Sequence, residues 1–189
     1  SFFAGTGAKP EGYVMTAGRL TGQKNQAMLI RAYASIASQV EQELRIYGEG
    51  ELRGELEKLI ASLNMEKRIR LMGASENMPE VLAGAGLFVL PSDYEGMPNA
   101  LLEAMAAGLC CISTACPCGG PESVIDQGVN GCLIPVGDEA ALAGAMLELL
   151  RDEKKRRKMG DSARRRAGSF RPEAVFEQWR QYVESVIGD

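Results

Sequence analysis

The sequence predicts an α/β protein built on a doubly wound parallel sheet of about six strands, with extra C-terminal helices. Short apolar segments alternate with amphipathic segments along the 189 residues. Several of the apolar segments lack an alternation of apolar and polar residues, as expected for strands buried on both faces of a parallel sheet. In such sheets ligands bind beyond the carboxyl ends of the strands, so the site should lie in the loops that follow them.

The first half of the chain supplies three strand–helix pairs. The segment YVMTAG is a short apolar strand ended by a glycine, and QAMLIRAYASIA places apolar residues at helical spacing. MPEVLAGAG is typical of a short helix that begins with proline. The predicted strands of this half are residues 13–18, 43–48 and 68–73, and the predicted helices are residues 26–37, 51–63 and 78–86.

The second half continues the alternation and ends in helices. LFVLP is typical of a strand, and PNALLEAMAAG is a helix with proline at its start and glycine at its end. Asp138 is a suitable N-cap for a later helix. The predicted strands of this half are residues 87–91, 109–114 and 131–136, and the predicted helices are residues 98–108, 121–128, 138–152, 153–168 and 172–187.

Composition argues against several classes of protein. The net charge of −4 is not that of a dedicated nucleic-acid binder, whose footprint is basic. No apolar stretch approaches the roughly 18 residues that span a bilayer. The chain contains no histidine, which excludes Ser-His-Asp and Cys-His catalysis within it. Acid–base chemistry must therefore use carboxylates, lysine, tyrosine or a histidine from elsewhere.

The five cysteines favour structural thiols over a metal site. Their number is odd, no histidine accompanies them, and their spacing is not that of a paired C-x-x-C knuckle. The cluster of Cys111, Cys116 and Cys118 keeps a metal as a minor alternative. We expect reduced, partly buried thiols in a cytoplasmic protein, with no metal and no cofactor.

The first candidate motif follows the first strand. Gly18 turns the chain, and Arg19 and Lys24 lie in the same loop. Two cations there could hold a doubly charged diphosphate, arginine through its planar fork and lysine as a point charge. Taken alone, the motif favours ordinary surface charge.

Two glycine-containing segments are weaker candidates. GEGELRG (48–54) approximates a phosphate loop, but Arg53 occupies the position of its third glycine, so a tight turn is favoured. The segment CPCGGPES leads into a short helix that carries Glu122, and GVNG (128–131) is a tight turn. Ordinary loop chemistry accounts for each when taken alone.

The stretch YEGMPNALLEAMAAG is the third candidate motif. Gly96 lets the backbone approach a ligand closely, and Pro98 suits the first turn of a helix. The amides of Asn99, Ala100 and Leu101 would then be free to meet an anion, helped by the helix dipole.

The two glutamates of this stretch do not share one solvated helix face. Glu95 precedes the predicted helix, and Glu103 lies about one and a half turns inside it. They can therefore meet opposite ends of a ligand with phosphates between them. Carboxylates accept hydrogen bonds from hydroxyl groups, so a sugar and a ribose are natural partners.

One run of basic residues lies near the end of the chain. It could attract an anionic membrane surface. Interspersed Asp152, Glu153 and Asp161 favour instead a pair of solvated helices. The basic residues are Arg151, Lys154, Lys155, Arg156, Arg157, Lys158, Arg164, Arg165 and Arg166.

Taken in order, these motifs resemble the C-terminal half of the retaining glycosyltransferases of family 4, which have the GT-B architecture. The matching segments are Gly18-Arg19-Leu20 with Lys24-Asn25, YGEG, Glu95-x7-Glu103 with LLEAMAAG, and Glu122 followed by DQGVNGCLIPVGD. The resemblance covers about residues 13–187, and the order and spacing of the segments make it specific.

The resemblance implies that residues 13–170 form a Rossmann-like domain, one half of a GT-B fold, that binds a nucleotide-diphosphate sugar without a metal. Arg19 and Lys24 would grip the diphosphate, Glu95 would face the transferred sugar and Glu103 would bind the ribose. The base would lie near residues 73–77. The implied donor-binding set is Gly18, Arg19, Lys24, Glu95, Gly96, Met97, Pro98, Asn99, Ala100 and Glu103, with Glu95, Arg19 and Lys24 as catalytic residues.

The family enzymes also have a first Rossmann-like domain that carries the acceptor site and a catalytic histidine. This chain has no room for that domain and no histidine. We therefore expect residues 1–12 to be a linker remnant and residues 171–189 to form a helix that packs on the missing N-terminal domain, with Phe176 and Trp179 partly exposed here. The fragment should bind nucleotide but transfer little or no sugar.

The function implied is transfer of a hexose or N-acetylhexosamine, with UDP as the commonest carrier in the family, to a polysaccharide or glycolipid acceptor. The CPCGGPESVI stretch resembles members that assemble bacterial surface polysaccharide, and the full-length enzyme could associate peripherally with the inner face of the membrane. Two alternatives stay open at this point. One is a related GT-B enzyme such as a nucleotide-sugar epimerase or a phosphorylase, and the other is a non-catalytic α/β binding module.

Overall fold

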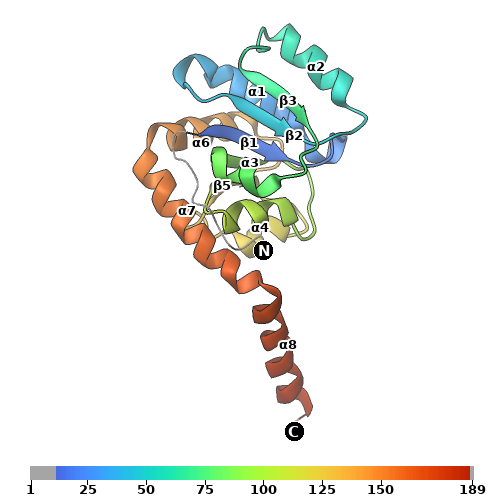
Figure 1. Cartoon of the computed structure of the whole chain (residues 1–189), viewed down its shortest axis with the longest axis vertical. Coiled ribbons are helices and arrows are strands. Elements are labelled where there is room, and N and C mark those ends of the chain that lie inside the picture. Colours follow the sequence, from blue (N-terminus) through green and yellow to red (C-terminus); the bar gives the residue numbers. More distant parts are fainter. Residues whose placement is uncertain (1–11, 188–189) are drawn as a thin grey trace.

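The computed structural model describes residues 12–187, which form one parallel sheet of six strands. The strand order is β3-β2-β1-β4-β5-β6, the doubly wound order expected from the sequence (Figure 1). The strands are β1 (Tyr13–Ala17), β2 (Leu44–Tyr47), β3 (Ile69–Gly73), β4 (Ala85–Leu90), β5 (Cys110–Thr114) and β6 (Cys132–Ile134). The predicted linker remnant lies outside the described residues except for Gly12.

Helices cover both faces of the sheet. They are α1 (Gln26–Ile36), α2 (Arg53–Ser62), α3 (Met78–Gly84), α4 (Asn99–Ala106), α5 (Gly120–Val124), α6 (Glu139–Arg151), α7 (Glu153–Ala167) and α8 (Pro172–Ile187). The apolar side chains of α1, α2 and α6 pack in one cluster, and those of α3, α4 and α5 pack in a second cluster on the other face. The sheet thus has an apolar layer on each side, as the doubly wound class requires.

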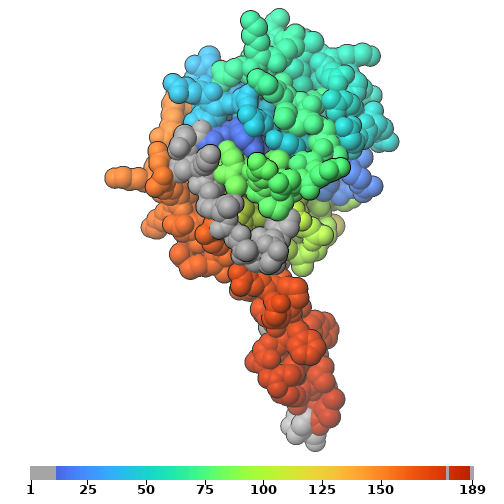
Figure 2. Space-filling model, in the orientation of Figure 1, coloured from blue at the N-terminus to red at the C-terminus, as the bar shows by residue number. Residues whose placement is uncertain are grey.

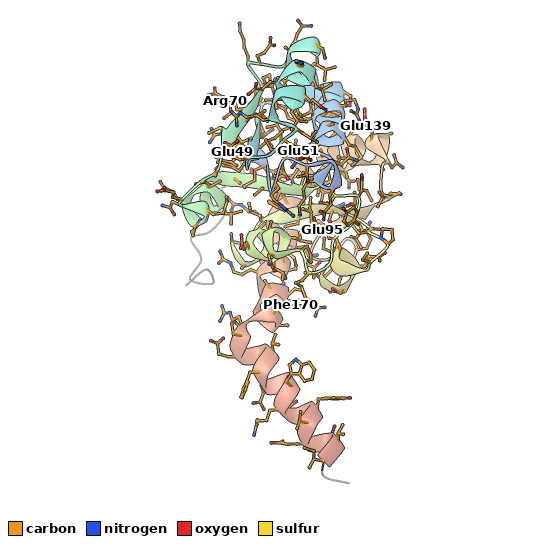
Figure 3. The ribbon with its side chains drawn as sticks, turned by 90° about the vertical axis from the view of Figure 1, so that its right-hand side faces the viewer. Glu49, Glu51, Arg70, Glu95, Glu139 and Phe170 are labelled. Carbon is orange, nitrogen blue, oxygen red and sulfur yellow. The ribbon has the colours of Figure 1, made fainter. Side chains whose placement is uncertain are left out.

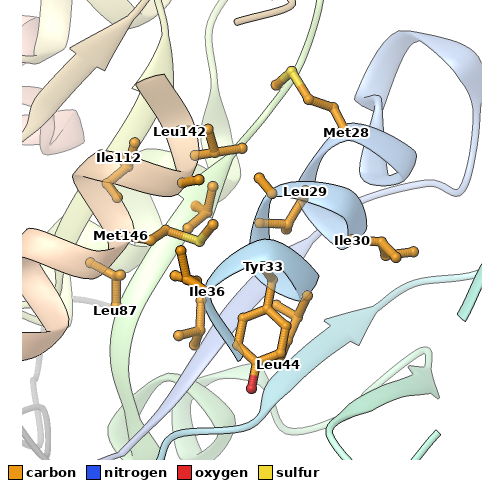
Figure 4. Close-up of a cluster of buried hydrophobic side chains, with 14 of the residues drawn as sticks. Met28, Leu29, Ile30, Tyr33, Ile36, Leu44, Leu87, Ile112, Leu142 and Met146 are labelled. Atoms are coloured by element: carbon orange, nitrogen blue, oxygen red, sulfur yellow. The ribbon is translucent and has the colours of Figure 1, made fainter. Parts of the chain in front are cut away.

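The first of these clusters is centred on α1. Tyr33 and Ile36 of α1 pack with Met146 of α6 and with Leu87 of β4, and all four side chains are buried (Figure 4). The helical spacing expected for this segment therefore puts one apolar face on the sheet. Each such side chain contributes about 1.5–3 kcal/mol when it leaves water.

The central and edge strands differ as their positions demand. Every residue of β4 and β5 is buried, because both strands have neighbours on both edges and helices on both faces. The edge strand β3 instead exposes Arg70 and Met72. The lack of in/out alternation in the sequence is thus strongest in the middle of the sheet.

Most element boundaries lie within two residues of their predicted positions, and two of the differences have a visible structural cause. β4 begins at Ala85 rather than at residue 87, because Ala85 pairs with Tyr13 through an irregularity in the β1–β4 ladder. α5 ends at Val124 rather than at residue 128. Its continuation is replaced by a turn in which the Asn130 side chain accepts from the Asp126 amide and donates to the Val124 carbonyl.

The strand order also creates the expected crevice. β1 lies between β2 and β4, and the chain leaves β1 for α1 on one face and β4 for α4 on the other. The loops that follow β1 and β4 therefore diverge from adjacent strand ends. Such a switch point is where ligands bind in open α/β sheets.

The helix α8 extends away from the rest of the domain (Figures 1 and 2). Phe176 is 70% exposed and Trp179 is 62% exposed, which confirms that both are at least partly exposed in this chain. Packing of α8 on another domain stays a prediction. Within residues 12–187, no helix has the length and apolar character needed to cross a membrane.

The basic run lies mainly on α7, where several of its members have partners within the chain. Lys155 pairs with Glu148, and Arg157 pairs with Glu153. Arg164 donates to the Ala107 carbonyl. These contacts favour the interpretation of solvated helices tied to their own domain over that of a free basic patch.

Candidate functional site

The carboxyl ends of β1 and β4 bring Lys24 and Glu95 into direct contact. Lys24 Nζ lies 2.5 Å from Glu95 Oε1, although the two residues are 71 positions apart. The Glu95 side chain is 7% exposed and that of Lys24 is 19% exposed, so the pair is largely removed from water. Glu95 lies within the body of the domain, far from α8 (Figure 3). Two of the three predicted catalytic residues therefore meet at the switch point.

Further hydrogen bonds fasten the two loops to each other. Asn25 Nδ2 donates to Asp93 Oδ1 at 2.7 Å, and the Asp93 amide donates to the Gln23 carbonyl at 2.9 Å. Gln23 Nε2 donates to the Tyr94 carbonyl. Asn25 adopts a left-handed conformation with φ of 42° and caps α1 by accepting from the Met28 amide. The start of α1 thus sets the place of Lys24.

A buried polar cluster lies behind Glu95. Ser92 Oγ donates to Glu95 Oε1 at 2.6 Å. The Ser92 carbonyl in turn accepts from the Thr114 hydroxyl and from the Cys116 thiol. Ser92, Thr114 and Cys116 are each 0% exposed. The last residue of β5 and a residue just after it thereby fix the loop that carries the glutamate.

The glycine-rich segment after β2 serves close packing between two loops. Gly48 has φ of +135°, and a Cβ atom there would lie 1.9 Å from the Gly18 carbonyl oxygen. The Gly18 amide donates to the Tyr47 carbonyl, and the Leu20 amide donates to the Glu49 carbonyl. Only glycine permits this approach, so the packing of the turn accounts for Gly48 without a phosphate cradle.

The segment before α5 borders the same site. A Cβ atom on Gly120 would lie 1.8 Å from the Gly96 carbonyl oxygen, so the start of α5 packs directly on the loop that holds Glu95. Glu122 is exposed and makes no side-chain hydrogen bond or ion pair to the residues that the structure describes. The motif thus supports the site through its glycine, while a role for Glu122 is not indicated.

Arg19 lies in the same loop with its side chain in solvent. It is exposed and makes no side-chain hydrogen bond within residues 12–187, whereas its carbonyl accepts from Gln26 Nε2 at 2.9 Å. The backbone position of Arg19 is therefore fixed and its guanidinium is available. An exposed guanidinium with no side-chain partner among the described residues, in the same loop as a lysine, suits an anion with two negative charges.

The expectation for the amides that start α4 is wrong for two of the three. The Asn99 amide donates to the Met97 carbonyl, and the Leu101 amide donates to the Pro98 carbonyl, because the first turn is tight. Within the described residues the Ala100 amide has no acceptor. Pro98 is buried at the N-cap position, where its missing N–H costs nothing. The predicted binding roles of Met97, Pro98, Asn99 and Ala100 stay predictions.

Glu103 differs sharply from Glu95. It lies inside α4, is partly buried, and has no side-chain partner among residues 12–187. Burial raises the pKa of the Glu103 carboxyl above its ordinary value. A partly buried carboxylate without a partner is costly, so this group is well suited to accept hydroxyl hydrogen bonds from a ligand.

The segment predicted for the base lies beside a surface hollow under α3. Ser75 and Asn77 line one side of it. Tyr13 and Arg45 also line it, and the Arg45 guanidinium stacks on the Tyr13 ring at 3.8 Å. Tyr13 begins β1 and Tyr47, another lining residue, ends β2, while neither Lys24 nor Glu95 lines this hollow.

Four of the five cysteines are at least partly buried, as expected, and Cys118 is exposed. The five are free, and Cys110, Cys111 and Cys116 are buried. Burial raises the pKa of Cys110 to about 12 and that of Cys111 well above its ordinary value. Thiols of this kind are poor nucleophiles and poor metal ligands at neutral pH. No group of three or more potential metal ligands is found within residues 12–187.

Sequence reasoning missed the residues that hold Glu95 in place. Ser92, Asp93 and Thr114 are types common in any loop or strand end, so their composition carries no signal. The Thr114 contact depends on the adjacency of β4 and β5, and the Asp93 contacts depend on the adjacency of β1 and β4. The one available clue was position, because Ser92 lies three residues before Glu95.

The fold and the site define the class of this protein. A doubly wound sheet with a largely buried cation–carboxylate pair at its switch point, and an exposed arginine in the same loop as the cation, has the architecture of one domain of a GT-B glycosyltransferase. Residues 2–166 match the protein family described as Glycosyl transferases group 1, and the chain belongs to that family.

Several characterised relatives are similar over most of the chain. An N-acetyl-alpha-D-glucosaminyl L-malate synthase of Bacillus anthracis is 35% identical over 162 residues, which cover 85% of this chain and 42% of the relative. An N-acetylgalactosaminyltransferase of Campylobacter jejuni that acts on a diphospho-undecaprenol is 34% identical over 84% of this chain and 42% of its own length. The chain thus spans less than half the length of these relatives.

Solved structures give the same answer for the fold. Anabaena HepE in complex with UDP is 26% identical, with a TM-score of 0.81 over 93% of this chain and 49% of HepE. The C-terminal domain of a glycosyl transferase group 1 protein from Francisella tularensis is 22% identical. It has the same fold, with a TM-score of 0.74 over 83% of this chain and 85% of that domain.

Proposed function

We propose that this chain is the donor-binding half of a retaining glycosyltransferase that uses a UDP-sugar. The observation that carries the proposal is the Lys24–Glu95 pair at the switch point, with the free Arg19 guanidinium in the same loop. Diphosphate and sugar are adjacent in such a donor, and this cluster offers cations and a carboxylate side by side. The sugar would be a hexose or N-acetylhexosamine, and the acceptor a polysaccharide or glycolipid.

Each of these residues binds a different part of the donor. Arg19 and Lys24 hold the diphosphate, and their charge stabilises it as it leaves, which is the role a metal plays in other enzymes. Glu95 accepts a hydroxyl of the transferred sugar, and Glu103 accepts the ribose hydroxyls. Gly96 lies between Glu95 and Glu103 in the sequence. Because glycine has no side chain, the backbone there can approach the donor closely.

These contacts imply the course of the reaction. Departure of the diphosphate leaves an oxocarbenium-like centre at the anomeric carbon, and a hydroxyl of the acceptor attacks from the face that the diphosphate leaves. The bond from carbon to the phosphate oxygen breaks, the bond from carbon to the acceptor oxygen forms, and the acceptor hydroxyl proton passes to the departing phosphate oxygen. The configuration at the anomeric carbon is therefore retained.

Relatives support the choice of donor. One similar structure, Anabaena HepE, contains UDP, and a pneumococcal O-GlcNAc transferase that is 26% identical over 98% of this chain contains UDP and GlcNAc. Two of the relatives described above carry N-acetylhexosaminyl transfer in their names. A UDP-N-acetylhexosamine is accordingly our first donor to test.

We further propose that sugar transfer needs an N-terminal domain. The chain covers 42–49% of most of the similar curated proteins, it contains no histidine, and α8 presents apolar side chains to solvent. An N-terminal domain of the same GT-B architecture would cover α8 and supply the acceptor site. The isolated chain should therefore bind donor and transfer little or no sugar.

The test is a calorimetric panel of UDP-, GDP- and ADP-sugars against the chain and two variants. We expect binding of UDP-sugars, and a loss of affinity of about tenfold or more in Arg19→Ala and in Glu103→Ala, because each removes a charge-assisted contact. Arg180→Ala on the exposed surface of α8 is the matched control and should bind normally.

Other outcomes separate the alternatives. A non-catalytic module would show no nucleotide affinity or an affinity untouched by Arg19→Ala and Glu103→Ala. Sugar transfer by the isolated chain at the rate of a full-length enzyme would contradict the half-site proposal. An epimerase-like enzyme would interconvert UDP-sugars when joined to its N-terminal domain, and a transferase would not.

A further inference from the structure

Both polar contacts of the Glu95 side chain end on the same oxygen. Lys24 Nζ lies 2.5 Å and Ser92 Oγ 2.6 Å from Glu95 Oε1. Glu95 Oε2 makes no hydrogen bond within residues 12–187. It is not one of the fully buried side-chain atoms without a partner, so Oε2 keeps some exposure to solvent. The carboxylate is thus anchored through one oxygen and open through the other.

Ser92 cannot itself touch a ligand. It is 0% exposed, and its carbonyl is held by Thr114 and Cys116, both of which are also fully buried. Its hydroxyl hydrogen has Glu95 as its acceptor. Any influence of this hydroxyl on a ligand must therefore pass through the orientation of the glutamate.

The contacts of Lys24 and Ser92 with Glu95 would respond differently to a bound donor. Lys24 has three N–H donors on a flexible stem, and a diphosphate beside Arg19 would compete with Glu95 for them. Ser92 has a single O–H and is out of reach of the diphosphate. When Lys24 turns toward phosphate, the serine is the contact that keeps Oε1 in place.

We propose that Ser92 is a positioning residue for donor recognition: it holds Glu95 Oε1 so that Oε2 alone faces the sugar and accepts one of its hydroxyl groups. This rests on the proposed function and deepens it. In this proposal, Glu95 Oε2 alone recognises the sugar. Ser92, which lies outside the site, sets the orientation of that oxygen. We also predict that Ser92 matters for the sugar and not for the nucleotide.

The test compares UDP with UDP-N-acetylglucosamine and UDP-glucose on the whole chain. In Ser92→Ala we expect the affinity for whichever UDP-sugar binds the unmodified chain to fall roughly tenfold, which is the weight of one charge-assisted hydrogen bond. The affinity for UDP should stay within about twofold, because the diphosphate and base contacts do not involve Ser92. Ser92→Cys, which is close in size and a weak donor, should show the same pattern.

Two further variants make the result specific. Glu95→Gln should reduce UDP-sugar affinity, and adding Ser92→Ala to it should cost nothing more, since the serine acts only through the glutamate. Ser113→Ala is the matched control. Ser113 is also 0% exposed, and its hydroxyl donates to the Thr114 carbonyl and makes no direct hydrogen bond to Glu95.

The outcomes distinguish this proposal from the one it rests on. Equal losses for UDP and UDP-sugar in Ser92→Ala, no loss at all, or losses that add to those of Glu95→Gln would each overturn the positioning role while leaving donor binding intact. Failure of the unmodified chain to bind either UDP or a UDP-sugar would overturn both proposals. Thermal unfolding of each variant shows whether a loss reflects misfolding, and Ser92→Cys carries the test if Ser92→Ala does not fold.

Discussion

Two regions of the molecule differ in which side chains they bury. One is the pair of loops at the ends of β1 and β4, and the other is the helix α8. At the strand ends, a charged side chain is buried beside polar partners: Glu95 is 6% exposed and is bound by Lys24 and Ser92 through one oxygen. Along α8, apolar groups are exposed, with Phe176 at 70% and Ile187 at 76%. The first region has partners for its buried glutamate within this chain, whereas the second leaves its apolar side chains exposed.

The difference lies in what stabilises each region. The strand-end loops are held by long-range hydrogen bonds between segments about 70 positions apart, such as Asn25 to Asp93. Helix α8 is held by its own local pairs, including Arg180 with Glu177 and Glu184, and by the edge-to-face contact of Trp179 with Tyr182. A helix stabilised only locally, with an exposed apolar face, has the properties of one side of an interface.

The largest expected difference is in the unfolding free energy lost when a buried or an exposed phenylalanine is replaced. Phe88→Ala in β4, where the side chain is 0% exposed, should cost about 3–5 kcal/mol of unfolding free energy. Phe176→Ala on α8 should change it by less than about 0.5 kcal/mol. Urea unfolding measures both. A large loss in Phe176→Ala would mean that α8 packs on this chain in solution.

The packing of the strand-end loops gives the next largest effect. Gly48→Ala should destabilise the chain by about 3 kcal/mol, because it adds strain at positive φ and a collision with the Gly18 carbonyl. Gly54→Ala in α2 is the control, since nothing lies within 4 Å of its added Cβ. It should stabilise the chain by about 0.5–1 kcal/mol through helix propensity. Equal behaviour of the two variants would contradict the tight loop packing.

The buried ion pair should matter less than the core but more than surface pairs. Lys24→Met should cost about 1–3 kcal/mol, because it leaves Glu95 buried beside an apolar side chain. Adding Glu95→Gln should recover part of that loss, because the uncompensated charge is removed. The Arg31–Glu139 pair is exposed at 44% and 40%, so Arg31→Met should cost less than about 1 kcal/mol. A Lys24→Met chain as stable as the parent would show that the pair is not formed in solution.

The smallest effect concerns pH. Burial raises the pKa of Glu103 in the folded chain above its value in the unfolded chain, so the unfolded state releases this proton first as pH rises. Glu103 thus lowers stability above the unfolded pKa and has no effect well below it. Glu103→Gln should stabilise the ligand-free chain at pH 7 by less than about 0.5 kcal/mol and lose this gain in acid. An equal effect at both pH values would point to a cause other than ionisation.

Most of the fold was predictable from the sequence, and about half of the site. Alternation of apolar strands with amphipathic helices is a local property, so the six strands and eight helices are all present near their predicted positions. Arg19, Lys24 and Glu95 were identified because each lies at a strand end. Their proximity depends on β1 and β4 being neighbours, which follows from the doubly wound order.

The remainder depended on contacts that no local pattern encodes. The hydrogen bond from Ser92 to Glu95 forms within the loop after β4. Thr114 and Cys116 hold this loop by donating to the Ser92 carbonyl. The tight first turn of α4 occupies the Asn99 and Leu101 amides, which propensity alone left free. Gly48 and Gly120 looked like ligand loops or simple turns, and the structure shows them as contact points between loops.

The most direct test of the central claim is an amide NMR spectrum of the chain titrated with UDP and then with a UDP-sugar. We predict saturable shifts in residues 18–25, 73–77 and 95–103, with Glu95 and its neighbours responding more to the UDP-sugar than to UDP. The amides of α8 should stay unchanged. Shifts confined to α8 or to the distal loop of residues 38–42, or no saturable shift at millimolar UDP, would contradict a donor site at the switch point of this sheet.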